Sequence, residues 1–185
     1  MSCDRPIRPL SRHLLRALAV AGLMALGACT VQPLYGLSTP AGATTPSMQA
    51  KLASVAISPV STRDAQIVRN RLIFLLAGGA GSPADPKYRV ELTVSKQSIG
   101  VGYTPQPQFL SDQVSGERIE MIGSYKLTDA EGNVLATGKR QAVASIDLPD
   151  QGFAARSARS NGAVRAGEDL AEMLRLAIAQ DLMRH

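Results

Sequence analysis

Cysteine and histidine are almost absent from this chain of 185 residues, which contains two of each. Cys3 and His13 lie within the first 28 residues, and His185 is the last residue. Sites of the Ser-His-Asp or Cys-His type need a histidine base, and most zinc sites need several Cys or His ligands. The scarcity argues against these hydrolase and metalloenzyme classes, and we expect neither a metal nor a cofactor. Paired carboxylates stay open as a catalytic possibility.

The first 28 residues have the pattern of a secretory signal peptide. An apolar run from Leu14 to Leu26 follows four arginines, Arg5, Arg8, Arg12 and Arg16. Such a run has the length of a signal-peptide core and falls short of the ~20 residues that span a bilayer as a helix. We therefore predict that residues 1–28 are a signal peptide that is removed.

The run closes with Leu26-Gly27-Ala28-Cys29, which places small residues directly before a cysteine. This order is typical of bacterial lipoproteins, in which cleavage leaves an N-terminal cysteine that carries acyl chains such as palmitate. The alternatives are an ordinary secretory signal or a short membrane anchor. We favour lipidation of Cys29, which also removes the last free thiol.

Little net charge is left once the leader is set aside. The whole chain has 20 Lys and Arg against 15 Asp and Glu, a net charge of +5. The leader holds four arginines and Asp4, so the other 157 residues carry 16 positive and 14 negative side chains. This small excess of positive charge does not indicate a nucleic-acid binding surface, and we expect no nucleic-acid partner. A chain of this length suits one domain with a tether.

The segment after the cysteine has the composition of a tether. Leu37 to Met48 is rich in Ser, Thr, Pro, Ala and Gly and has no apolar periodicity. An ordered loop on the domain is the alternative. Thr30 is compatible with export to the outer membrane, since Asp at that position is the usual retention signal for the inner membrane. We predict a lipidated N-terminus and flexible tether over residues 29–50 and a single periplasm-facing domain over 51–185.

The first part of the domain reads as a strand followed by a helix. Leu52–Ser58 is a short apolar strand candidate. A helix begins near Arg63, with Ser61 or Thr62 available as its N-cap. Gly78-Gly79 ends it. One apolar face is formed at three- and four-residue spacing by Ala65, Val68, Leu72, Leu75 and Leu76.

The middle of the domain reads as three strands. Alternation of apolar and polar residues from Tyr88 predicts a strand that runs on to Val101, followed by a polar connection that contains prolines. A second alternating run over Arg118–Leu127 leads through the turn Asp129–Asn133 into a strand over Val134–Leu148. These last two strands should form an antiparallel hairpin.

An amphipathic helix completes the domain, over about residues 155–183. Gly162 and Gly167 each cost about 1 kcal/mol in a helix interior, so we expect fraying or a bend near Gly162. The predicted fold is α+β: a two-layer sandwich of two helices on a roughly four-stranded mixed sheet, in the order strand, helix, strand, strand, strand, helix.

Several segments resemble the LPS-assembly lipoprotein family, LptE. Ala28–Gly36 resembles the start of that family, where a lipidated Cys is followed by Pro-Leu-Tyr-Gly. Arg63–Leu72 is similar to its first helix and Tyr88–Val90 to its second strand. The sequence departs from the family at Val31-Gln32, where many members have an aromatic or basic residue. The last helix of the family is similar to Phe153–Ala155, Arg165-Ala166 and Leu170-Ala171.

This resemblance implies a non-enzymatic component of the outer-membrane translocon for lipopolysaccharide. In that family the lipoprotein plugs the lumen of the β-barrel LptD, assists its assembly and contacts lipopolysaccharide. The expected partners are therefore an LptD-like barrel, lipopolysaccharide and the outer membrane itself, through the N-terminal lipid anchor.

Two other functions compete with this one. The first is an auxiliary lipoprotein of another envelope lipid-transport system of the ABC type. The second is a carboxylate-based periplasmic hydrolase that uses Glu117, Glu120 or Asp147. The hydrolase is disfavoured because the sequence shows no clustered pair of acids.

Basic residues on the predicted strands are the candidates for lipopolysaccharide contact. Arg and Lys side chains bind the phosphates and carboxylates of such a glycolipid. Lys and Arg on strands also commonly form a solvated face or protect a sheet edge, and that reading stays open. The candidates are Arg118, Lys126, Lys139 and Arg140.

Overall fold

The computed structural model describes residues 48–104 and 113–185, all within the unit Ala41–His185. The predicted signal peptide, Cys29 and the proline-containing connection after Thr104 lie outside the described residues. The elements in order are α2 (Met48–Ala53), β1 (Val55–Ile57), α3 (Arg63–Ala77), β2 (Tyr88–Thr104), β3 (Gln113–Asp129), β4 (Val134–Asp147) and α4 (Gly152–Leu182).

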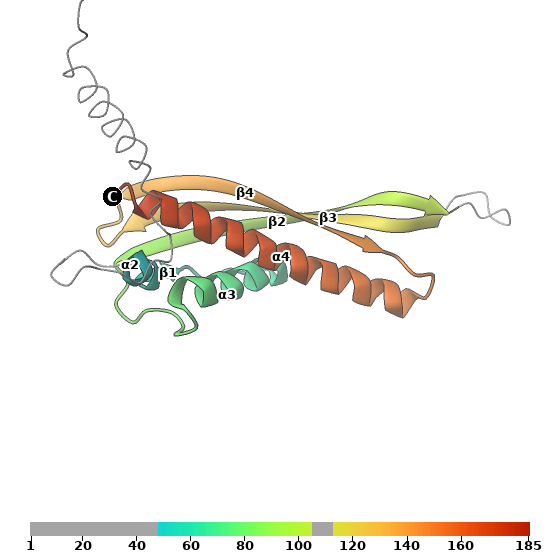
Figure 1. Ribbon diagram of the computed structural model, residues 1–185, viewed down its shortest axis with the longest axis horizontal. Helices are drawn as coiled ribbons and strands as arrows, with labels where there is room; N and C mark the ends of the chain where they lie inside the picture. The colour runs from blue at the N-terminus through green and yellow to red at the C-terminus, as the bar shows by residue number, and fades with distance from the viewer. Residues whose placement is uncertain (1–47, 105–112) are drawn as a thin grey trace, which may run out of the picture. The chain divides into compact units, whose positions relative to one another are not determined.

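The strands form one mixed sheet in the order β1-β2-β3-β4. β1 runs parallel to the start of β2, and both β2–β3 and β3–β4 are antiparallel. Figure 1 shows α3 and α4 on the same face of this sheet. The predicted α+β sandwich is confirmed, with α2 as an additional short helix.

α3 begins and ends at the residues that the sequence predicts. The Thr62 side chain accepts a hydrogen bond from the Ala65 backbone N–H at 3.2 Å, which caps the N-terminus. At the C-terminus Gly78 adopts a left-handed conformation with φ of 61°. Four residues of the apolar stripe are buried against the sheet and α4: Ala65, Val68, Leu72 and Leu76.

The start of the domain corrects the sequence prediction. The predicted strand over Leu52–Ser58 is shorter, because α2 extends to Ala53 and contributes Leu52 to the core as a helical residue. The first residues of α2, Met48–Ala50, belong to the range predicted as tether.

Two polar side chains of α2 fix its position against the other helices. Gln49 Nε2 donates to the Leu76 carbonyl at 3.4 Å, and Lys51 Nζ donates to the Leu182 carbonyl at 3.2 Å. The last carbonyls of a helix have no partner within that helix. α2 thus caps the C-terminal ends of α3 and α4 together.

α4 is one continuous helix, so the predicted fraying or bend near Gly162 is wrong. Gly162 and Gly167 are buried contact points. A Cβ atom at Gly162 would lie 2.6 Å from Ile146 Cγ2, and one at Gly167 would lie 2.8 Å from Ile67 Cγ2. Glycine lowers the helix propensity at these two positions, but it lets α4 pack closely against β4 and α3.

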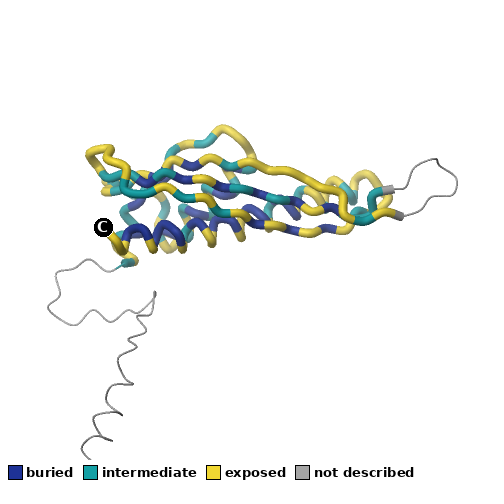
Figure 2. Tube along the Cα trace, turned by 90° about the horizontal axis from the view of Figure 1, so that it is seen from above, coloured by how far each residue is buried: buried dark blue, intermediate teal, exposed yellow. Residues whose placement is uncertain are grey.

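The core lies between the sheet and the helices. Buried residues recur along α4 from Gly162 to Leu182 and alternate with exposed ones along the strands (Figure 2). The largest fully buried side chains include Leu72, Ile119, Met121, Leu170 and Leu174. None of the helices in the part of the chain described here is long and apolar enough to cross a membrane.

Candidate functional site: the open face of the sheet

The face of the sheet opposite the helices is built from polar and charged side chains. Within residues 48–104 and 113–185, no helix covers this face, which we call the open face. An antiparallel sheet commonly keeps one face in water. Two apolar side chains, Ile99 and Val143, are also exposed on it. Its exposed polar residues are Arg89, Glu91, Thr93, Ser95 and Gln97 on β2, Arg118 and Ser124 on β3, and Thr137, Lys139, Gln141, Ser145 and Asp147 on β4.

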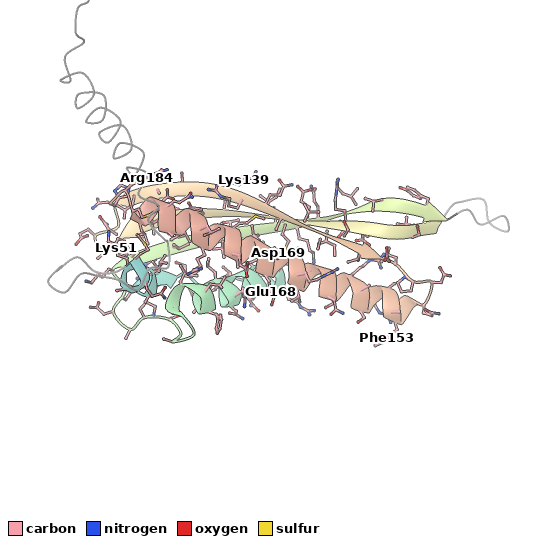
Figure 3. The ribbon with its side chains drawn as sticks, in the orientation of Figure 1. Lys51, Lys139, Phe153, Glu168, Asp169 and Arg184 are labelled. Carbon is pink, nitrogen blue, oxygen red and sulfur yellow. The ribbon has the colours of Figure 1, made fainter. Side chains whose placement is uncertain are left out.

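The four predicted lipopolysaccharide contacts divide between the two faces of the sheet. Arg118 and Lys126 alternate with buried residues and Lys139 is opposite exposed Ser124, so all three lie on the open face; Lys139 is labelled in Figure 3. Arg140 follows Lys139 directly and points to the helix side, where its charge acts on Tyr125. The adjacent pair that the sequence suggests is therefore split by the alternation of the strand.

Two of the lysines lie close together on the open face. Lys126 is opposite Thr137, and Lys139 is opposite Ser124, so the two are diagonal neighbours about 7–8 Å apart. Lys126 Nζ lies 2.6 Å from Glu91 Oε2, directly across on β2. Both of these side chains are about half exposed, so the pair contributes little to stability.

Arg89 joins these lysines, which the sequence could not show. It lies on β2 opposite Thr128, diagonal to Lys126. Only the strand register brings Arg89, Lys126 and Lys139 to one region, which we call the basic group. Glu91 is the single acid among them, so the region has a net positive charge.

Arg118 lies apart from the basic group. It is opposite Ile99 on β2 and Ser145 on β4. Ser124, the partner of Lys139, is six positions further along β3, which corresponds to about 20 Å. One small anionic group could not bridge Arg118 and Lys139, although an extended glycolipid could.

β4 is an edge strand whose outward carbonyls are capped by arginines. Arg140 Nη1 donates to the Lys139 carbonyl at 2.8 Å, and Arg165 Nη2 from α4 donates to the Ser145 carbonyl at 3.2 Å. Unpaired edge carbonyls and amides invite pairing with another chain. The structure therefore supports the edge-protection reading for Arg140.

The acids considered for a hydrolase do not converge. Glu117 is buried on the helix side, where Arg159 Nε lies 2.6 Å from its Oε2 atom. Glu120 points to the open face and accepts a hydrogen bond from Gln97 Nε2 at 2.9 Å. Among the described residues no group of three or more His, Cys, Asp or Glu side chains could hold a metal ion.

Arg159 decides the ionisation of Glu117. Burial by itself raises the pKa of this carboxyl group, but hydrogen bonds from Arg159 and Ser98 and the positive charge of Arg159 outweigh burial. The net result is a pKa below the ordinary value. Glu117 is therefore a paired carboxylate that joins β3 to α4, and its environment does not make it a proton donor.

A second polar contact joins β3 to the end of α4. Tyr125 Oη donates to Asp181 Oδ2 at 2.5 Å, and Arg184 Nη1 lies 3.5 Å from the other carboxylate oxygen. The Tyr125 ring lies over Gly138, where a Cβ would come within 2.5 Å of it. Burial and then the Asp181 carboxylate raise the pKa of Tyr125. The sequence shows no sign of this pair, because its members are 56 residues apart.

Solved structures resemble this fold. No protein-family profile and no curated protein matches the sequence. A candidate lipoprotein from Caulobacter crescentus superposes with a TM-score of 0.59 at 22% identity, over 72% of this chain and 93% of that one. An uncharacterized lipoprotein B from Nitrosomonas europaea gives a TM-score of 0.50 at 11% identity, over 68% and 81% of the two chains. The chain has the fold of these two proteins.

Proposed function

We propose that this protein is an outer-membrane lipoprotein, anchored by acyl chains on Cys29, that plugs an LptD-like β-barrel and helps assemble it for lipopolysaccharide insertion. The proposal has no catalytic step. Its anchor rests on Leu26-Gly27-Ala28-Cys29, and two proteins with the same fold are described as lipoproteins, one of them as a candidate. Together, an acyl anchor and a protein partner give stable attachment to a membrane.

The polar open face is the observation that carries the plug role. The interior of a large transmembrane barrel is polar, and a plug needs an extended surface that is polar as well. β2 and β3 are each 17 residues long and β4 has 14, so the open face extends over most of the domain. The large exposed apolar side chains of the long strands, within the described residues, are Ile99, Val101 and Tyr103 on β2 and Val134 and Val143 on β4, so polar residues predominate without excluding apolar ones.

The basic group supports lipopolysaccharide contact on the same face. Lys139 has no ion pair with another described residue, and Lys126 shares only one exposed acid. Positive charges without a buried counter-charge are free to bind phosphates of a glycolipid. Arg89 extends the group onto β2.

Site-specific photo-crosslinking in cells tests the plug role. A photoreactive residue at Gln141, on the open face, should form a crosslink to a large barrel protein. The control position is Asn70, which is exposed on the opposite side of the domain, on α3. Equal yields at both positions, or none, would contradict the assignment of the open face.

A mild-detergent purification of the lipidated protein separates the proposal from its main competitor. Recovery of a large barrel protein is expected. Recovery of ABC-type transporter components, with no barrel in any preparation, would replace the proposal with the auxiliary-lipoprotein function. The variant Cys29→Ala should lose lipid labelling and accumulate as the longer precursor.

A further inference from the structure

The outward surface of the two long helices is apolar in its C-terminal part. Four large hydrophobic side chains are exposed there: Phe74 at 55%, Met173 at 41%, Leu176 at 44% and Met183 at 54%. The earlier turns of the same helices expose polar residues such as Gln66. Phe153, 79% exposed, lies alone near the start of α4, so four of the five large exposed apolar side chains on α3, α4 and its C-cap are gathered toward one end of the helix layer.

One hydrogen bond and one ion pair between α3 and α4 show which of their turns lie side by side. Arg63 bonds to Ser160 and Arg71 to Glu172, so the two helices run in the same direction. Phe74 lies about one turn after Arg71, and Leu176 lies about one turn after Glu172. α2 is bonded to the C-terminal ends of both helices. We call the surface of Phe74, Met173, Leu176 and Met183 the apolar helix end.

Charge along α4 changes sign twice, because exposed arginines precede the acids at Arg156, Arg159 and Arg165 and a cation follows them at Arg184. Exposed acids lie midway, at Glu168, Asp169 and Glu172. Beyond them Asp181 is buried against Tyr125, while Arg184 is 75% exposed and Lys51 of α2 lies beside the last turn. Figure 3 shows Lys51 and Arg184 at one end of the domain, Glu168 and Asp169 midway and Phe153 at the other end.

A surface that combines exposed apolar side chains with cations suits an anionic lipid bilayer. Apolar side chains enter the boundary between headgroups and acyl chains, and Lys and Arg attract anionic headgroups. A soluble protein partner would explain the apolar patch, but it would not explain why the acids stop at the middle of α4.

The length of chain before α2 places a membrane within reach. Eighteen residues separate Cys29 from Met48, and they span at most about 60 Å in any conformation. Met48 begins α2, which is bonded to backbone carbonyls at the C-terminal ends of α3 and α4, beside the apolar helix end. A lipid on Cys29 would therefore hold this surface near the bilayer, where even a weak contact becomes intramolecular.

We propose that the apolar helix end rests on the anionic lipid surface of the membrane that holds the Cys29 anchor. The inference rests on the lipidation included in the proposed function. It leaves the open face, on the other side of the sheet, available to a barrel partner. A plug whose anchor lies in the bilayer must keep its tethered end at the mouth of the barrel, where lipid is accessible.

Fluorescence quenching by lipid tests the contact directly. The lipidated protein is reconstituted into vesicles of phosphatidylethanolamine and phosphatidylglycerol, with an environment-sensitive dye on Leu176→Cys. Cys29 is blocked by its acyl chains, so this thiol is unique in the mature chain. The matched control is Val143→Cys on the open face, because Val143 is 43% exposed and Leu176 is 44% exposed. Lipids with a nitroxide at the headgroup should quench the dye at 176 several-fold more than at 143.

Two results of this quenching experiment would contradict the proposal. Equal quenching at both positions would overturn it. The dye emission at position 176 could instead shift to the blue with rising protein concentration and show no quenching by nitroxide lipid. That result would assign the surface to contact with a second copy of the chain and would also overturn the membrane proposal. Omission of phosphatidylglycerol should reduce quenching at 176. Because no barrel is present, failure here leaves the crosslinking result at Gln141 as a separate test of the plug role.

Discussion

Gly162 of α4 lies so close to Ile146 of β4 that a Cβ atom on the glycine would stand 2.6 Å from Ile146 Cγ2. A second atom, Ile119 Cδ1 on β3, would be 2.8 Å away. Both contacts are shorter than van der Waals distance, and both partners belong to branched core side chains. The glycine therefore fixes the spacing between the long helix and the sheet.

Replacement of Gly162 by alanine should destabilise the protein although alanine is the better helix former. Helix propensity favours the change by about 1 kcal/mol, whereas overpacking in a core costs about 1–3 kcal/mol. We expect a net loss in the free energy of unfolding, measured by urea denaturation. Gly152→Ala is the control, because nothing lies within 4 Å of a Cβ there. A more stable Gly162→Ala protein would contradict the close packing.

Sequence periodicity predicted most of this fold because it depends on local pattern. The stripe of α3, its Thr62 cap and the turn at Gly132, with φ of 88°, follow from residue types a few positions apart. The alternation in β2 and β3 was equally clear. Local signals of this kind are strong when one face of an element is buried.

The errors arose where distant residues decide the outcome. Glycine has a low helix propensity, so Gly162 argued against a continuous helix. Its place in α4 is explained by the close contact between the helix backbone there and Ile146 of β4. Leu52 reads as part of a strand until α2 is seen to cap the carbonyls of two other helices. The basic group likewise depends on strand register, which composition cannot supply.

Tyr125→Phe should destabilise the protein by about 1–3 kcal/mol at neutral pH. The substitution leaves the buried Asp181 carboxylate without the donor that now lies 2.5 Å away. Urea denaturation measures the loss. Tyr103→Phe serves as the control, since Tyr103 is 62% exposed, and its stability should be unchanged. Equal stability of both variants would show that the contact between Tyr125 and Asp181 contributes nothing.

The same pair predicts a loss of stability in alkali. The pKa of Tyr125 is raised in the folded protein, so above about pH 10 the unfolded chain releases a proton that the folded protein keeps. The unfolded state then binds fewer protons, and stability falls as pH rises. Urea midpoints between about pH 8 and about pH 11 should drop more steeply for the wild type than for Tyr125→Phe. Parallel curves would rule out a contribution from this tyrosine.

Glu117 should make the protein sensitive to acid. Its pKa lies below the ordinary 4.5 in the folded state, so the stability that it contributes is complete above that value. The contribution is lost as pH falls through the lower, folded-state pKa. Glu117→Gln should be less stable than wild type at neutral pH, with a difference that shrinks on acidification. An equal difference at neutral and acidic pH would contradict this role of Glu117.

Charge reversal separates the roles of two adjacent residues, Lys139 and Arg140. Lys139 belongs to the basic group on the open face, whereas Arg140 points to the helix side and caps the Lys139 carbonyl. If the open face binds lipopolysaccharide, Lys139→Glu should weaken binding by about tenfold, the loss of one charge-assisted contact. Arg140→Glu should weaken binding no more than Arg156→Glu, a reversal on the exposed surface of α4. Titration of the purified domain with lipopolysaccharide measures all three, with urea denaturation to confirm folding. A larger effect at position 140 than at 139 would move the contact from the open face to the edge of β4.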